Sequence, residues 1–362
     1  MRILPLLLVA LLLAGCSTSA PRTASTTPAA SNEVTLLTYS AFGLNKSIFD
    51  DFTNLTGYKV TVLAQGDAGE VVSRAIASKD APVADALFGV DNALIHRARE
   101  AGIFQPYEGR ASAYVAERYK APFRGDNDTL LATPFDYGYV ELNYDTQWFH
   151  DHNLSLPTDL RQIAGATYAP LTVVESPQTS SPGFAFLLAT VARFNGTPGY
   201  SYKDFWSDYA KNGGKVATSW DQAYGDVFTQ GYDTTGSHDR PIVLSYSTSP
   251  AYNPMNGYGN ATSADLDVRQ GSWFQVEAIG VLAHAKNPKG AEALIDYLMA
   301  TDVQEKGAFQ QVEYPVVAGA NAPDAYLTYA PEPLEPAYLP GDQVDAHREE
   351  WLAGWRDATG QA

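Results

Sequence analysis

Aromatic and hydroxyl side chains are the residues of this sequence best suited to chemistry with a small molecule. The chain contains 22 tyrosines and six tryptophans, more than a core needs, and both types can stack on a flat ligand while hydrogen-bonding to it. A dense run extends from Tyr246 through Ser249 to Tyr252. Motifs arranged for catalysis are missing: the sequence has no G-x-S-x-G elbow, H-E-x-x-H motif, P-loop or thiol nucleophile. The pattern favours a binding protein over an enzyme.

Two short polar runs come near the spacing of metal ligands. His150-Asp151-His152 lies in a polar turn before Pro157, and Asp126-Asn127-Asp128 lacks the downstream glycine and glutamate of a calcium loop. We interpret both runs as turns. We therefore expect neither a metal site nor a cofactor.

The single cysteine, Cys16, has a different chemistry. Arg2 and the apolar stretch from Ile3 to Leu13 have the size of a signal-peptide core, about half of the roughly 20 residues that a membrane-spanning helix needs. They lead into Leu13-Ala14-Gly15-Cys16, the arrangement of a bacterial lipobox. We expect residues 1–15 to be a lipoprotein signal peptide and Cys16 to carry the lipid that anchors the protein, outside the cytoplasm, to the cell membrane. The folded part then has no disulfide.

Composition divides the rest of the chain. Residues 16–32 are mostly Ser, Thr, Ala and Pro without an apolar period, which predicts a flexible tether. The roughly 330 residues that follow exceed the size at which one core stops growing, so two lobes are expected. The formal charge of −17 argues against nucleic acid and anionic lipid headgroups as partners and favours a cationic ligand, although solubility would also explain it.

The elements that must position the aromatic residues alternate between strands and helices. Strand patterns occur at 34–39, 59–63 and 84–88, and helix patterns at 45–56, 69–78 and 93–101. This alternation predicts an α/β fold with a parallel sheet covered by helices. Such sheets bind ligands at the carboxyl ends of their strands.

Two long extended runs, at 134–144 and 273–282, are where the chain could cross between the lobes and back. We therefore predict that lobe 1 consists of residues 33–137 and about 278–362, and lobe 2 of residues 138–277. A helix is expected over 288–309. A terminal helix over 349–355 places Trp351 and Trp355 on one face, where they would dock on the fold.

Several segments resemble the thiamine-binding periplasmic proteins of bacterial ABC importers, within the type II solute-binding class. They follow one another in the family's order along almost the whole mature chain. The matching segments are Leu37–Phe42, Ala84-Asp85, Gly89–Asn92, Pro134–Tyr139, Thr179–Gly183, Ser219–Gly225, Val243–Tyr252, Gln275–Glu277 and Tyr314–Val316. The resemblance implies two lobes joined by two crossover strands, a ligand cleft between them, a monomer, and an ABC permease as the membrane partner.

The resemblance also implies a ligand site, residue by residue. Three of the family's contacts are aromatic and one is acidic. A glycine that is usual in the family is an alanine here. A Ser-Thr pair and a run of tyrosine and hydroxyl residues supply the other contacts. In this sequence the matching positions are Tyr39, Trp220, Tyr252, Asp67, Ala68, Ser180, Ser181, Tyr246, Ser247, Thr248 and Ser249.

One position departs from the family. The tryptophan that the family carries two residues before its Tyr-Pro is Val312 here. One wall of the aromatic cage is therefore missing or comes from elsewhere, and Trp273 is the candidate for it.

These residue types suit thiamine. Its thiazolium is a permanent cation, which gains about 0.5–2 kcal/mol from each aromatic face, and the Asp67 carboxylate adds Coulombic attraction. Ser181 could cap a helix that has Pro182 in its first turn, and such a helix N-terminus could receive a phosphate. Asp67 could instead be only a helix cap, because Glu70 stands at the capping-box position.

The expected function is the capture of thiamine or its phosphates and delivery to a permease. Two alternatives remain open: a receptor for another small ligand, such as a polyamine or ferric ion, or a secreted hydrolase that uses an unrecognised serine. Clustered tyrosines suit ferric ion, but such a site also wants clustered carboxylates and histidine. No histidine lies near Ser180 or Ser247 in the sequence, which disfavours the hydrolase.

Overall fold

The computed structural model describes residues 31–333 and 335–361. The expected signal peptide, Cys16 and most of the expected tether lie outside the described residues. Ser31 and Asn32, which composition assigned to the tether, already join the fold: the amide of Lys59 donates to the Asn32 carbonyl at 2.8 Å, and Asn287 Nδ2 donates to the Ser31 carbonyl at 2.8 Å. Within the described ranges, no helix is both long and apolar enough to cross a membrane.

The described residues form a mixed sheet whose main path has the order β2-β1-β3-β10-β5-β8-β6-β7. The strands on this path are β1 (Glu33–Thr38), β2 (Lys59–Ala64), β3 (Ala86–Asp91), β5 (Thr133–Asp145), β6 (Thr172–Glu175), β7 (Lys215–Ala217), β8 (Ile242–Tyr246) and β10 (Trp273–Leu282). Three short strands pair beside it, namely β4 (Phe104–Gln105), β9 (Ser263–Asp265) and β11 (Tyr314–Pro315).

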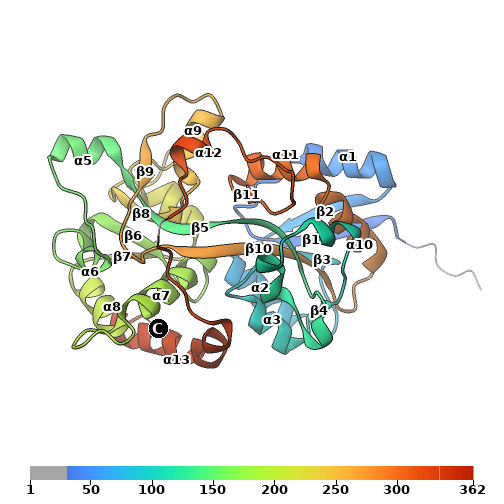
Figure 1. Ribbon diagram of the computed structural model, residues 1–362, viewed down its shortest axis with the longest axis horizontal. Helices are drawn as coiled ribbons and strands as arrows, with labels where there is room; N and C mark the ends of the chain where they lie inside the picture. Colours follow the sequence, from blue (N-terminus) through green and yellow to red (C-terminus); the bar gives the residue numbers. More distant parts are fainter. Residues whose placement is uncertain (1–30, 334, 362) are drawn as a thin grey trace, which may run out of the picture. The chain divides into compact units, whose positions relative to one another are not determined.

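Helices cover the sheet on the two sides of its long central strands (Figure 1). The longer ones are α1 (Lys46–Thr56), α2 (Ala68–Ala77), α3 (Ile95–Ala101), α5 (Thr146–His152), α7 (Ser181–Phe194), α8 (Tyr202–Lys211), α10 (Pro288–Leu298), α11 (Thr301–Gln311) and α13 (Gly341–Thr359). Four single turns are α4 (Glu117–Lys120), α6 (Leu160–Ile163), α9 (Tyr252–Met255) and α12 (Tyr326–Tyr329).

Two lobes meet along β5 and β10. Lobe 1 contains β1 to β4 with α1, α2, α3, α10 and α11, and lobe 2 contains β6 to β8 with α6, α7 and α8 (Figure 1). The two long strands run through both, as the extended runs at 134–144 and 273–282 predicted. They pair antiparallel with each other and β10 also pairs antiparallel with β3, whereas β1 is parallel to β2 and β3. The expectation of a parallel sheet is therefore right for the β1–β3 end and wrong at the centre, because the chain crosses in both directions there.

Local sequence explains the ends of α1 and the burial of α7. The side chain of Asn45 caps α1, and Gly57 ends that helix in a left-handed conformation at φ 80°, which glycine adopts at little cost. Helix α7 is buried along most of its length, which matches its continuous apolar run from Phe184.

Two helices differ from the prediction. The expected helix over 288–309 is interrupted at Ala300, whose backbone is extended at φ −68° and ψ 140° and precedes α11. The terminal helix is longer than expected and packs on lobe 2, where Trp355 meets Trp206 edge to face at 6.1 Å. Trp351 and Trp355 are both buried, as expected of docking residues, but the assignment of the last residues to lobe 1 is wrong for α13.

Candidate functional site

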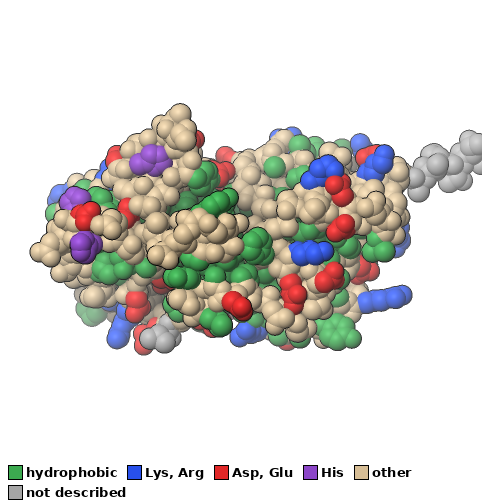
Figure 2. Space-filling view, turned by 90° about the horizontal axis from the view of Figure 1, so that it is seen from above, with side chains coloured by type: hydrophobic (Ala, Val, Ile, Leu, Met, Phe, Trp, Pro, Cys, Tyr) green, Lys and Arg blue, Asp and Glu red, His purple; other side chains and the backbone are tan. Residues whose placement is uncertain are grey.

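A pocket of about 420 Å³ lies between the two lobes. Its walls come from the ends of β1 and β8, from Glu277 in the middle of β10, from the first turns of α2 and α7, and from the end of α11 and the residues that follow it. The lining residues are Tyr39, Ala41, Gly43, Gly66, Asp67, Ala68, Ser181, Pro182, Ser219, Trp220, Asp221, Tyr224, Tyr232, Tyr246, Thr248, Ser249, Tyr252, Glu277, Gln310, Gln311, Val312 and Glu313. Hydrophobic side chains, a class that includes Tyr and Trp, gather in the middle of the face shown in Figure 2.

Nine of the eleven residues predicted for the ligand site line this pocket; Ser180 and Ser247 do not. Ser180 is buried and caps α7, because its Oγ accepts a hydrogen bond from the amide of Gly183. Ser247 is also fully buried, and its amide donates to the carbonyl of Tyr139 at 2.9 Å. Both residues therefore support the wall from behind.

Trp273 does not replace the missing tryptophan, which corrects the sequence-based expectation. It is the first residue of β10, and the β10 residue that reaches the pocket is Glu277. Four residues of strand span about 13 Å, so Trp273 lies too far along the strand. Its side chain packs in the hydrophobic core instead.

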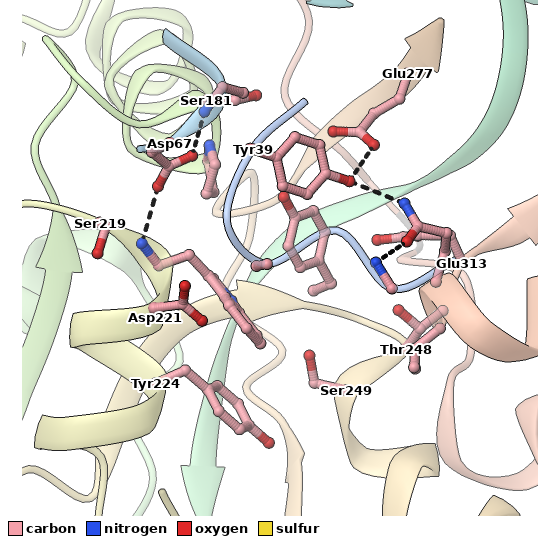
Figure 3. Close-up of a pocket in the computed structure, with 18 of the residues that line it drawn as sticks. Tyr39, Asp67, Ser181, Ser219, Asp221, Tyr224, Thr248, Ser249, Glu277 and Glu313 are labelled. Carbon is pink, nitrogen blue, oxygen red and sulfur yellow. Dashed lines mark hydrogen bonds between the residues drawn. The ribbon is translucent and has the colours of Figure 1, made fainter. Parts of the chain in front are cut away.

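Asp67 is a helix cap, one of the two roles that the sequence left as alternatives, and it also lines the pocket. It caps α2, with its Oδ1 accepting from the amide of Ala68 at 2.7 Å and Glu70 completing the capping box. Its Oδ2 accepts from the amide of Trp220 at 2.9 Å, a bond that joins α2 of lobe 1 to lobe 2 (Figure 3). Burial raises the pKa of Asp67, and the two backbone donors oppose that rise.

Aromatic rings form the lobe 2 wall of the pocket. Trp220 stacks on Tyr224 with ring centres 5.0 Å apart and planes at 16°, and Tyr232 lies 6.5 Å from Trp220. The indole Nε1 of Trp220 donates to Ser245 Oγ at 3.0 Å, which fixes the ring. The sequence analysis missed Tyr224 and Tyr232. Tyr224 is four residues after Trp220 in a π-helix, Asp221–Val227, and that spacing was the available signal.

Tyr39 connects the aromatic part of the pocket to acidic residues that were also missed. Its hydroxyl donates to Glu277 Oε2 at 2.8 Å and accepts from Gln311 Nε2 at 2.9 Å (Figure 3). Glu277 belongs to the segment Gln275–Glu277 that carried the family resemblance, yet it was not proposed as a site residue. Glu313 directly follows Val312, the position of the missing tryptophan, and it was not proposed as a site residue either.

The first turn of α7 does not have the arrangement expected of a phosphate site capped by Ser181. Ser180, not Ser181, is the cap, and Ser181 is the first helical residue. The hydroxyl of Ser181 donates to the buried carboxylate of Asp91, and Gln275 Nε2 donates to both. Burial raises the pKa of Asp91 to about 6, although the hydroxyl of Ser181 and the amides of Leu94 and Ala93 oppose the rise. The helix start already faces a carboxylate, which is unfavourable for a phosphate.

The charges around the pocket all have one sign. Four carboxylates line it, from Asp67, Asp221, Glu277 and Glu313, and among the described lining residues there is no Lys, Arg or His. Tyr246 lines the same pocket. Burial and then the charges of Glu277, Glu313 and Asp67 raise the pKa of its hydroxyl. An acidic, aromatic pocket of this size suits a flat organic cation.

Two α/β lobes joined by two long strands, with a ligand-sized pocket between them, define a type II periplasmic binding protein. The chain belongs to the family described as bacterial extracellular solute-binding protein, which its residues 43–305 match. Members of this family bind solutes for ABC importers.

Individual relatives narrow the comparison. The chain is similar to the thiamine-binding periplasmic protein of Brucella melitensis, at 26% identity over 335 residues that cover 91% of this chain and 93% of that protein. It is similar to the thiamine-binding periplasmic protein of Escherichia coli, at 28% identity over 277 residues that cover 76% of each. A solved structure described as a periplasmic thiamin binding protein superposes with a TM-score of 0.75 at 23% identity and covers 90% of this chain and 96% of that one.

Proposed function

We propose that this protein captures thiamine in the pocket between its lobes and delivers it to an ABC permease, without catalysing a reaction. The observation that carries the proposal is the pocket itself, lined by stacked aromatic rings and four carboxylates. The names of its relatives agree with this ligand. Thiamine phosphates are the related ligands to be compared with it.

The chemistry of thiamine matches the two kinds of wall. The thiazolium is a permanent cation that is attracted to aromatic faces and to carboxylates. The aminopyrimidine is flat, so it can stack on Trp220 or Tyr39, and its N–H groups can donate to the carboxylates. Closure of the lobes on the ligand would remove water and strengthen these interactions.

The alternatives find less support. Among the described residues, no group of three or more His, Cys, Asp or Glu is placed to hold a metal ion, which argues against a ferric site. The hydroxyl of Ser181, the pocket serine nearest a charged partner, is bonded to Asp91 rather than to a histidine base, so a hydrolase is not favoured. A polyamine would suit the carboxylates but would leave the stacked rings without a flat partner.

Thermal unfolding and intrinsic fluorescence test the proposal. Protein stripped of ligand by unfolding and refolding should melt at a higher temperature with thiamine, since binding at a hundredfold excess over Kd stabilises the native state by about 2.7 kcal/mol. Thiamine should also quench the fluorescence of Trp220. The Trp220→Phe variant should lose most of the quenching. An unchanged melting temperature and unchanged fluorescence at saturating thiamine would contradict the proposal.

The anchor at Cys16 is part of the same proposal. A receptor held at the outer surface of the membrane stays close to its permease, and the lipobox Leu13-Ala14-Gly15-Cys16 supplies the means. Cys16→Ser should leave the protein unprocessed at that site or release it from membranes, as mass spectrometry and membrane fractionation would show. An unchanged mature mass with unchanged membrane partitioning would rule out lipidation of Cys16.

A further inference from the structure

Three carboxyl groups lie together at one end of the pocket, and Figure 3 shows two of them, Glu277 and Glu313, on the side away from Asp67. Glu277 of β10 pairs directly with Asp136 of β5, and Asp136 also pairs with Pro315 of β11. The third group, Glu313, comes just before β11 and approaches the backbone of Gly138 so closely that a methyl group there would overlap its carboxylate. Glu277 and Glu313 line the pocket, and Asp136 lies behind them.

Two of these carboxyl groups, those of Asp136 and Glu313, lack the partners that buried polar groups normally have, whereas Glu277 accepts from the hydroxyl of Tyr39. Asp136 is 1% exposed, and neither of its oxygens accepts a hydrogen bond. Glu313 is 9% exposed, and its Oε2 is buried without a partner. The amide of Gln311 is close, but its Nε2 donates to Tyr39. Of these groups Glu313 lines the pocket, where a ligand would supply the missing partner of its buried oxygen.

Charges within the cluster also raise the pKa of two of its members, Asp136 and Glu313. Burial and then the charge of Glu277 raise the pKa of Asp136, and burial followed by the charges of Asp136 and Glu277 raises the pKa of Glu313. Burial likewise raises the pKa of Glu277, and the hydrogen bond from the hydroxyl of Tyr39 opposes this rise. A positive group placed beside them would favour their ionised forms.

The backbone next to Glu313 is strained. Val312 ends α11 in the left-handed conformation, at φ 60° and ψ 41°, which is a rare conformation for a β-branched residue. Strain of this kind persists where the surrounding structure requires it and gathers at ligand sites. Here the turn takes the chain from α11 into β11 and brings Glu313 to the pocket wall.

We propose that Glu277, Glu313 and Asp136 form a second cation-binding pole, which takes a protonated or N–H-bearing nitrogen at the end of the ligand remote from Asp67. The pole makes the pocket select ligands with a nitrogen group at each end and discriminate against phosphorylated ones. A phosphate carries a charge of about −1.5 to −2 and would meet four carboxylates. This inference rests on the proposed function, because it concerns the same pocket.

Calorimetric titration of ligand-stripped protein tests the pole with thiamine, thiamine monophosphate and spermidine as probes. Wild-type protein should bind thiamine about ten-fold or more tightly than the monophosphate. Glu313→Gln should weaken thiamine about ten-fold, the loss expected for a charged hydrogen bond, and should narrow the preference over the monophosphate. The matched control Glu33→Gln makes the same chemical change on an exposed side chain outside the pocket, and it should alter neither value.

The outcomes separate this inference from the proposed function. Unchanged thiamine binding by Glu313→Gln, or equal binding of thiamine and its monophosphate by the wild type, would overturn the pole and leave thiamine as the ligand. Spermidine binding that Glu313→Gln weakens ten-fold, without any thiamine binding, would overturn thiamine as the ligand and support the pole. If neither thiamine nor spermidine binds the wild type, both proposals are wrong.

Discussion

At the scale of single residues, one contact of Asp67 could be predicted from the sequence and another could not. The spacing of Asp67 and Glu70 indicated a capping box, and the family resemblance indicated a ligand contact. The structure contains the capping box and also places Asp67 at the pocket. One side-chain oxygen accepts from the amide of Ala68 and the other from the amide of Trp220. The bond to Trp220 connects residues 153 positions apart, so no local pattern could predict it.

Asp67→Asn should weaken thiamine binding while the protein stays folded. Asn caps helices about as well as Asp, but its single side-chain oxygen cannot accept from both Ala68 and Trp220. Loss of a hydrogen bond to a charged group costs about 1.5–3 kcal/mol, or roughly ten- to a hundred-fold in Kd. Calorimetric titration with thiamine measures the change.

The control for this variant is Asp159→Asn. Asp159 caps α6 with a capping box of the same type but does not line the pocket. Its replacement should leave the affinity for thiamine unchanged. Wild-type affinity in Asp67→Asn would mean that the carboxylate serves only as a cap.

At the scale of elements, periodicity predicted most strands and the two crossings between lobes. It failed where tertiary contacts decide. Leu298-Met299-Ala300 favours helix, and the local sign of the break at Ala300 is the pair Thr301-Asp302, residue types that are common at helix starts. Likewise, the charged first half of α13 concealed a helix whose stability comes from packing on lobe 2. Glu277, Glu313 and Asp136 were missed because only the pairing of β5 with β10 and β11 brings these residues together.

Gly69 marks the contact between α2 and lobe 2 that closes the pocket. A Cβ at this position would lie 2.5 Å from the carbonyl oxygen of Thr179, a backbone atom that cannot rotate away. Gly69→Ala should therefore hold the lobes apart. The cost, about 1–3 kcal/mol for overpacking, should appear as roughly ten-fold or greater weakening of thiamine binding.

Unfolding of Gly69→Ala should change little, because alanine favours helix over glycine and the lobes themselves remain intact. Gly341→Ala is the matched control, since a Cβ at Gly341 of α13 meets open space. Titration and denaturant unfolding of both variants give the comparison. If Gly69→Ala binds thiamine as tightly as the control does, the contact at Thr179 is not needed for closure.

At the scale of the whole molecule, buried acids should make stability depend on pH. Burial raises the pKa of Glu141 to about 8, and burial and the charge of Glu141 raise the pKa of Asp265 to about 9. In the unfolded chain both groups titrate near pH 4. Between these values the folded state holds protons that the unfolded state releases, so the free energy of unfolding should fall as pH rises from about 4 to 9.

Denaturant unfolding at pH 5.5 and pH 8 checks this dependence, with the protein more stable at pH 5.5. Glu141→Gln and Asp265→Asn should each reduce the difference, because neither replacement can ionise. Glu33→Gln, on an exposed side chain, should leave the difference as in the wild type. Equal stability at both pH values in the wild type would show that these carboxyls do not hold their protons in the folded protein.

Native mass spectrometry of the protein as it is purified from cells tests most directly whether the pocket holds thiamine. The molecule that the protein carries is then released and identified. Binding between closed lobes predicts one molecule per chain, with the mass of thiamine rather than of a thiamine phosphate. The same protein after unfolding and refolding should lose this mass and regain it when thiamine is added. A different retained molecule, or a refolded protein that thiamine does not restore to the bound mass, would contradict the account.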